Sequence, residues 1–178
     1  RRRVRARCWF LPRGSSNVAG TMALVPRIVD AVEIPVIAAG GIADGRGIAA
    51  ALMLGAAGVQ IGTAFLTTPE SMVAPVHKSE LLKASGDDTM LSKAFSGRAA
   101  RTLVNDYASE MDAVRDWPDF PLVNTMTGPL RKVSAEAGRP DAVALWSGQA
   151  AGLIRQATTA QTVERLVAET KSCLQRFA

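Results

Sequence analysis

The chain contains 178 residues, 48% of them hydrophobic, and carries a formal net charge of +5 at pH 7. Its length allows one well-packed core but is short of the roughly 250 residues of a closed eight-stranded α/β barrel, and no apolar run approaches the ~20 residues of a membrane-spanning helix. The first 14 residues hold six arginines and no acidic residue. Because the remainder is nearly neutral, we expect neither a nucleic-acid nor a membrane partner.

Residues 1–20 form a basic tail in which apolar residues follow no regular period. We predict that this tail is poorly packed through about residue 16, with Trp9 and Phe10 outside the main core. Three origins are open: an organelle transit peptide, a flexible basic extension, or a first part foreign to the rest through truncation or a shifted reading frame. We favour the third, because the sequence changes character abruptly near Thr21.

A strand–helix–strand unit is predicted over residues 34–63, after a helix over residues 21–33 for which Thr21 is the expected cap. Two short apolar runs typical of buried parallel strands flank one helical segment. Asp44 is placed to cap that helix, and Gly55 to end it in a left-handed conformation. The expected strands are residues 34–37 and 58–61, with parallel pairing and both following turns at the same sheet edge.

Both predicted strands end in small residues, the first in Gly40 and Gly41 and the second in Gly62 and Thr63. Without a Cβ atom, the glycine N–H groups can be approached closely by an oxyanion such as phosphate. The Thr63 hydroxyl adds a further polar group. An alternative is open, in which the glycines only form tight turns between strand and helix.

Beyond residue 63 the pattern predicts alternating short elements. A helix is expected over residues 67–85, because a threonine, a proline and an acid follow one another at its start. An edge strand is expected over residues 90–95, and residues 112–130 are expected to be rich in loops. The further helical segments are residues 98–107, 130–137, 142–148 and 159–177, the last with an apolar stripe that should dock.

Two long runs closely resemble a known family. AAGGIADGRGIAAAL followed by LGAAGVQIGTAFL is similar to the phosphate-binding end of the nitronate monooxygenases, once called 2-nitropropane dioxygenases, which are FMN-dependent TIM-barrel flavoenzymes. FSGRAAR at residues 95–101 and LWSGQ at residues 145–149 resemble two further family segments. The resemblance covers roughly residues 20–170 and fits the C-terminal part of the family.

The resemblance implies the fold class and the domains. The class is α/β, the C-terminal part of an FMN-binding TIM (β/α)8 barrel with a smaller helical or α+β substrate-side domain. Residues 21–65 would contain barrel strands seven and eight with flanking helices, where such barrels build their phosphate sites. Residues 66–155 would form the smaller domain, and residues 156–178 a helix returning to the barrel.

The resemblance also implies a cofactor and an activity. FMN would be the cofactor, and an alkyl nitronate and O2 the small-molecule substrates, with a carbonyl compound and nitrite as products. The residues that match FMN-binding positions are Gly40, Gly41, Gln60, Ile61, Gly62 and Thr63. Backbone N–H groups of Gly41, Gly62 and Thr63 would hold the phosphate, with the Thr63 hydroxyl as an added donor. Gln60 would instead reach the ribityl chain or the ring.

No catalytic residue is assigned. Family members carry a Gly-Gly-His base upstream of the helix that corresponds to residues 21–33, and nothing here matches it. The chain has one histidine, His77, which we interpret as structural or facing solvent. Arg98 and Arg101 could pair with an anion, but solvated or salt-bridged arginines are the favoured interpretation. Cys8 and Cys173 form no metal-ligand spacing and no disulfide framework, so the default location is the cytoplasm.

Three functions therefore compete. The first is a nitronate monooxygenase-like oxidoreductase, represented by a C-terminal fragment without the catalytic base. The second is a non-catalytic remnant or interaction fragment. The third is an FMN-dependent enoyl-acyl-carrier-protein reductase, whose phosphate loops are similar. The FSGRAAR and LWSGQ segments favour the first, and the sequence leaves the physiological substrate and the oligomeric state open.

Overall fold

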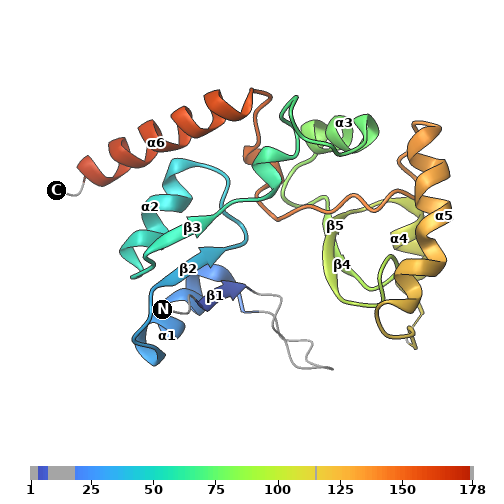
Figure 1. The fold of residues 1–178 in the computed structure, drawn as a ribbon, viewed down its shortest axis with the longest axis horizontal. Helices are drawn as coiled ribbons and strands as arrows, with labels where there is room; N and C mark the ends of the chain where they lie inside the picture. The colour runs from blue at the N-terminus through green and yellow to red at the C-terminus, as the bar shows by residue number, and fades with distance from the viewer. Residues whose placement is uncertain (1–3, 8–18, 115, 177–178) are drawn as a thin grey trace.

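The computed structural model describes residues 4–7, 19–114 and 116–176, which form two lobes (Figure 1). One lobe contains a three-stranded parallel sheet, and the other a two-stranded antiparallel sheet. Within the described residues no helix is long and apolar enough to cross a membrane.

The parallel sheet has the order β1 (Val4–Arg7), β2 (Val36–Ala39) and β3 (Gly58–Gln60). Ala39 at the end of β2 pairs with Gln60 at the end of β3. Because the strands are parallel, the turns that follow them lie at one sheet edge. The predicted strand–helix–strand unit is confirmed, although the first strand begins two residues later than expected.

Strand β1 corrects the prediction of an unpacked tail. Val4 pairs with Val36 and Arg7 with Ala39, so residues 4–7 form a third parallel strand beside the two that the sequence predicts. The physical reason is that β2 presents unpaired backbone N–H and C=O groups along its free edge. A strand can add there through backbone hydrogen bonds. A regular spacing of apolar residues does not predict such pairing, because the bonds do not depend on the side chains. Trp9 and Phe10 lie outside the described residues.

Helices α1 (Thr21–Ala31) and α2 (Gly45–Met53) pack against the sheet around a core made of Val25, Ala38, Ile42, Ala51 and Ala56. The Asp44 side chain accepts a hydrogen bond from Gly47 N at 3.0 Å, so the predicted cap is confirmed. Gly55 has φ +91°, which confirms the left-handed end. The N-cap of α1 is Gly20, so the expectation that Thr21 caps this helix is wrong.

The last helix, α6 (Thr159–Gln175), lies along α2 and confirms the predicted docking (Figure 1). Thr158 and Gln161 form a capping box at its start. Its buried residues are Thr162 and Leu166, whereas Val163 and Val167 of the predicted stripe remain 46% and 48% exposed. The contact with α2 is therefore narrower than the stripe.

The second lobe packs around a separate apolar core that includes Leu81, Leu103 and Leu145. Its elements are η1 (Thr63–Phe65), α3 (Pro75–Lys83), β4 (Thr89–Ser92), β5 (Ala100–Leu103), α4 (Asp106–Met111), α5 (Leu122–Glu136) and η2 (Ala151–Leu153). Strands β4 and β5 pair antiparallel, which supports the edge strand expected near residues 90–95.

The expected helix start at residues 67–71 is wrong. Helix α3 begins at Pro75, and the preceding residues form turns. The Thr68 hydroxyl donates to Phe65 O at 3.0 Å instead of capping a following helix. The Glu70 carboxylate accepts hydrogen bonds from Thr159 N and Oγ1 at 3.2 and 3.1 Å. Glu70 therefore accepts hydrogen bonds at the start of α6, a helix that is distant in the sequence.

Two further helix predictions and one loop prediction are wrong in part. The centre of residues 98–107 is strand β5 instead of helix, because it pairs with β4. Residues 142–148 contain a turn and an isolated β-bridge at Trp146 instead of a helix, and Leu103 N donates to Leu145 O at 2.9 Å. Helix α5 begins at Leu122, inside the segment predicted to be loop, and continues through Pro129. Non-local pairing overrides local propensity in the first two cases.

Candidate functional site: two glycine turns at one sheet edge

The first turn follows β2. Gly40 and Gly41 are both exposed and have φ of +104° and +69°, a backbone region that favours glycine. The Thr21 hydroxyl donates to Gly40 O at 2.7 Å, so the start of α1 holds the turn in place. A Cβ atom added at Gly41 would meet nothing within 4 Å. The position that a side chain would occupy at Gly41 is therefore open.

The second turn follows β3 and leads into η1. Gly62 is exposed, and an added Cβ atom there would also meet nothing within 4 Å. Phe65 N donates to Gly62 O at 2.9 Å, which closes the short helix. The N–H groups of Gly41, Gly62 and Thr63 donate to no acceptor among the described residues. Free backbone donors of this kind attract anions.

The Thr63 hydroxyl is oriented by a residue far away in the sequence. Gly148 N donates to Thr63 Oγ1 at 2.9 Å. A Cβ atom on Gly148 would lie 3.3 Å from Thr63 Oγ1 and 3.9 Å from Gly41 N. An N–H group is only a donor, so Thr63 Oγ1 accepts this bond and keeps its own proton for another acceptor.

Gly148 is not among the site residues that the sequence predicts. It belongs to the LWSGQ segment, which the sequence marks only through its resemblance to a family. That motif is the available signal, because its spacing from the glycine turns contains no information on contact.

Gln60 and Ile61 immediately precede the second turn but differ in their surroundings. Gln60 is the last residue of β3 and is partly buried. Ile61 packs against the core between α1, α2 and the sheet. The Ile61 side chain is therefore structural, and only its backbone is available to a ligand.

His77 is buried and lies on α3, with its Nε2 atom 3.1 Å from Trp146 O. Burial lowers the pKa of His77, although the contact with the Trp146 carbonyl partly opposes this. These contacts support its interpretation as a structural residue. Within the part of the chain that the structure describes, no cluster of three or more His, Cys, Asp or Glu residues could hold a metal ion.

Arg98 and Arg101 contact residues outside the glycine turns. Arg101 Nη1 donates to Thr89 Oγ1 at 3.0 Å across the β4–β5 pair. The Arg98 guanidinium lies 5.4 Å from the centre of the Phe120 ring. Arg98 is exposed, which agrees with a solvated arginine, whereas Arg101 is partly buried and donates to a neutral threonine instead of an acid.

A sequence profile described as nitronate monooxygenase matches residues 12–169. This range contains both glycine turns, Gly148 and most of α6, and it begins inside the basic segment of residues 1–20. The chain belongs to the nitronate monooxygenase family.

Three relatives illustrate the similarity. A probable nitronate monooxygenase of Staphylococcus aureus (strain Newman) is 45% identical over 139 residues, which are 78% of this chain and 39% of that protein. The structure of nitroalkane oxidase from Streptomyces ansochromogenes is 41% identical with a TM-score of 0.85, over 89% of this chain and 46% of that one. FabK from Thermotoga maritima is 38% identical with a TM-score of 0.74, over 88% of this chain and 50% of that one.

The chain therefore spans about 39% to 50% of the length of these relatives. Its described residues match part of TIM-barrel proteins, but their three parallel strands do not close a barrel.

Proposed function

We propose that the two glycine turns bind the phosphate of FMN, and that the chain contributes this end of a nitronate-oxidising flavoenzyme. The observation that carries the proposal is a group of donors at one sheet edge. The N–H groups of Gly41, Gly62 and Thr63 have no acceptor among the described residues, and the Thr63 hydroxyl accepts a bond while its own proton is left for an acceptor. A phosphate has several acceptor oxygens and fits a site with several donors.

The residues present fit the phosphate in two respects. The positions where Gly41 and Gly62 would carry a Cβ atom are open, so no side chain of these two residues would obstruct an oxyanion. No carboxylate is hydrogen-bonded to either turn among the described residues, so a dianion would meet no fixed negative charge in direct contact. Gln60 lies at the adjoining strand end, and we assign its amide to the ribityl chain or the ring.

FMN, when bound, would supply the redox chemistry that converts an alkyl nitronate and O2 into a carbonyl compound and nitrite. The contribution of this chain would be to hold and orient the phosphate through the residues named above. Proton removal from a neutral nitroalkane needs a base. His77, the sole histidine, already contacts the Trp146 carbonyl, so we assign it no such role.

Two other functions remain as alternatives. The first is an FMN-dependent enoyl-acyl-carrier-protein reductase, whose phosphate loops are similar. The FSGRAAR and LWSGQ segments and the higher TM-score of the nitroalkane oxidase favour the first proposal. A non-catalytic remnant would have the same fold but no preference for the phosphorylated flavin.

Binding of FMN and of riboflavin to the purified chain, followed by flavin fluorescence, tests the proposal. We expect FMN to bind more tightly than riboflavin, because only FMN has the phosphate. Equal affinities, or no binding of FMN, would reject the phosphate site and favour the non-catalytic alternative.

A further inference from the structure

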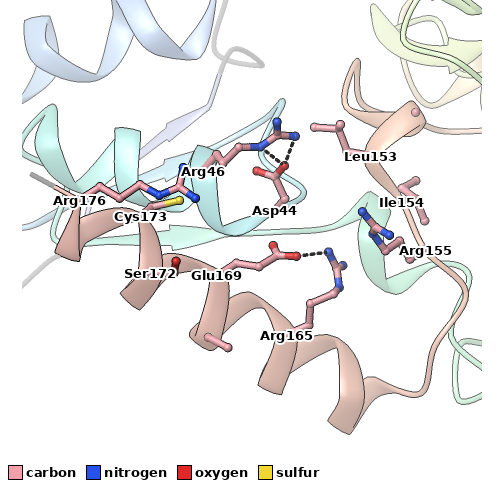
Figure 2. Close-up of a pocket in the computed structure, with 12 residues that line it drawn as sticks. Asp44, Arg46, Leu153, Ile154, Arg155, Arg165, Glu169, Ser172, Cys173 and Arg176 are labelled. Carbon is pink, nitrogen blue, oxygen red and sulfur yellow. Dashed lines mark hydrogen bonds and ion pairs between the residues drawn. The ribbon is translucent and has the colours of Figure 1, made fainter.

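A cleft lies where α2 and α6 of the first lobe meet η2 of the second lobe. It has a volume of about 800 Å³ and opens between the start of α2, the segment around η2, and the second half of α6 (Figure 2). Its lining residues include none of the glycines or the threonine of the phosphate turns. This cleft is therefore lined independently of the proposed FMN site.

Four arginines from three separate segments line the cleft. Arg46 comes from α2, Arg155 follows η2, and Arg165 and Arg176 come from α6 and its end. Figure 2 shows their guanidinium groups around the same opening. Guanidinium groups bind phosphate oxygens in a bidentate manner, which suits them to phosphate recognition.

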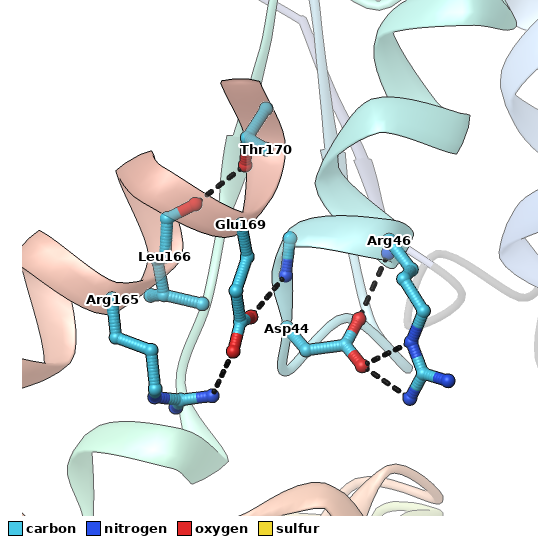
Figure 3. A network of polar contacts seen from close by, with 8 residues as sticks. Asp44, Arg46, Arg165, Leu166, Glu169 and Thr170 are labelled. Carbon is cyan, nitrogen blue, oxygen red and sulfur yellow. Dashed lines mark hydrogen bonds and ion pairs between the residues drawn. The ribbon is translucent and has the colours of Figure 1, made fainter. Parts of the chain in front are cut away.

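The two carboxylates of the cleft are already engaged (Figure 3). Asp44 accepts from Arg46 Nε at 2.8 Å and from Gly47 N at 3.0 Å. Burial would raise the pKa of Asp44, but the hydrogen bonds from Arg46 and Gly47 outweigh it and hold the pKa below its usual value. Asp44 therefore remains charged and paired at neutral pH.

Glu169 is the second engaged carboxylate. It accepts from Gly45 N at 2.9 Å and from Arg165 Nη1 at 3.2 Å, and so ties α6 to the start of α2. Each acid thus neutralises one arginine, which leaves two cleft arginines to be accounted for.

The unpaired cations are Arg155 and Arg176, which contact no acid among the described residues. The cleft therefore has an excess of two positive charges.

We propose that this cleft binds a phosphate monoester of about nucleotide size. The two unpaired guanidinium groups match the charge of a dianion, whereas a carboxylate would neutralise only one of them. Leu153 and Ile154 give one side of the cleft an apolar surface for the organic part of the ligand. The volume also lies within the range of small-molecule sites, roughly 300–1,000 Å³.

Titration of the full chain with adenosine 5′-monophosphate, followed by calorimetry, tests this site, with adenosine as the ligand that lacks the phosphate. We expect the monophosphate to bind and adenosine not to bind measurably. The double substitution Arg155→Ala with Arg176→Ala should weaken binding about tenfold, since exposed charge pairs contribute modestly. These side chains have no hydrogen-bonding partners in the described fold, so circular dichroism should be unchanged.

One further variant tests whether the monophosphate binds in this cleft. Arg139→Ala removes an exposed arginine outside the cleft and should leave binding unchanged, which tests general charge attraction. The proposal is overturned if the monophosphate fails to bind at millimolar concentration, if the double variant binds it normally, or if Arg139→Ala weakens it equally.

Discussion

Replacement of Thr63 by valine is the most direct perturbation of the proposed phosphate site. Valine keeps the branched shape but removes the hydroxyl that accepts from Gly148 N at 2.9 Å. The loss of a hydrogen bond to a charged group is worth about 1.5–3 kcal/mol, and the partly exposed position of Thr63 favours the lower end. Each 1.4 kcal/mol corresponds to a factor of about ten in affinity. We therefore expect FMN binding to weaken roughly 10- to 30-fold.

The assay is flavin fluorescence titration of wild-type chain, Thr63→Val and Thr63→Ser, each with FMN and with riboflavin. Serine retains the hydroxyl, so its affinity for FMN should remain within about twofold of wild type. Riboflavin binding should be the same in all three, because it has no phosphate for the hydroxyl to reach. Equal weakening by serine and valine, or an equal loss of riboflavin binding, would refute the reasoning.

Three other outcomes are expected. Gly55→Ala should destabilise the fold by about 2 kcal/mol or more, because φ is +91° and the new Cβ atom would lie 2.8 Å from Val29 Cγ1. Gly138→Ala, at φ +67° with nothing within 4 Å, should cost only about 1 kcal/mol of unfolding free energy. Urea unfolding measures both losses, and equal losses would contradict the packing argument. Burial lowers the pKa of His77, so stability should fall as the pH drops below the unfolded value of about 6.5, and His77→Gln should remove that dependence between about pH 7 and pH 5. The purified chain with FMN should release nitrite from neutral nitroalkanes far more slowly than about 1 s⁻¹; faster release would show that another residue of the chain acts as the base.

The local elements of the first lobe are predictable from the sequence because their signals are short-range. Asp44 caps α2 through an N–H three residues away, and Gly55 adopts a positive φ that its own lack of a Cβ atom permits. Parallel pairing of β2 and β3 follows from the almost obligatory handedness of a strand–helix–strand unit. The family resemblance also rests on contiguous motifs and is confirmed by the profile match.

The second lobe is less predictable because its elements depend on distant partners. Residues 100–103 lie in a segment whose sequence predicts a helix. They form β5 instead, since β4 and the segment at Trp146 supply backbone partners. Glu70 has the sequence context of a helix start, yet its carboxylate binds Thr159 at the start of α6. In the first lobe, strand β1 forms because β2 offers a free edge, and its own residues show no distinctive apolar pattern.

The candidate site divides in the same way. The sequence alone predicts which residues an anion would contact, because glycines at strand ends and a neighbouring hydroxyl are recognisable without any contact information. Only the tertiary structure decided how the Thr63 hydroxyl is used, by bringing Gly148 N to 2.9 Å across 85 positions of the chain. It also decided that Arg46, Arg155 and Arg176 share one cleft. Contacts of this kind depend on how helices and strands pack, and side-chain packing is specified by the whole fold instead of by neighbours in sequence.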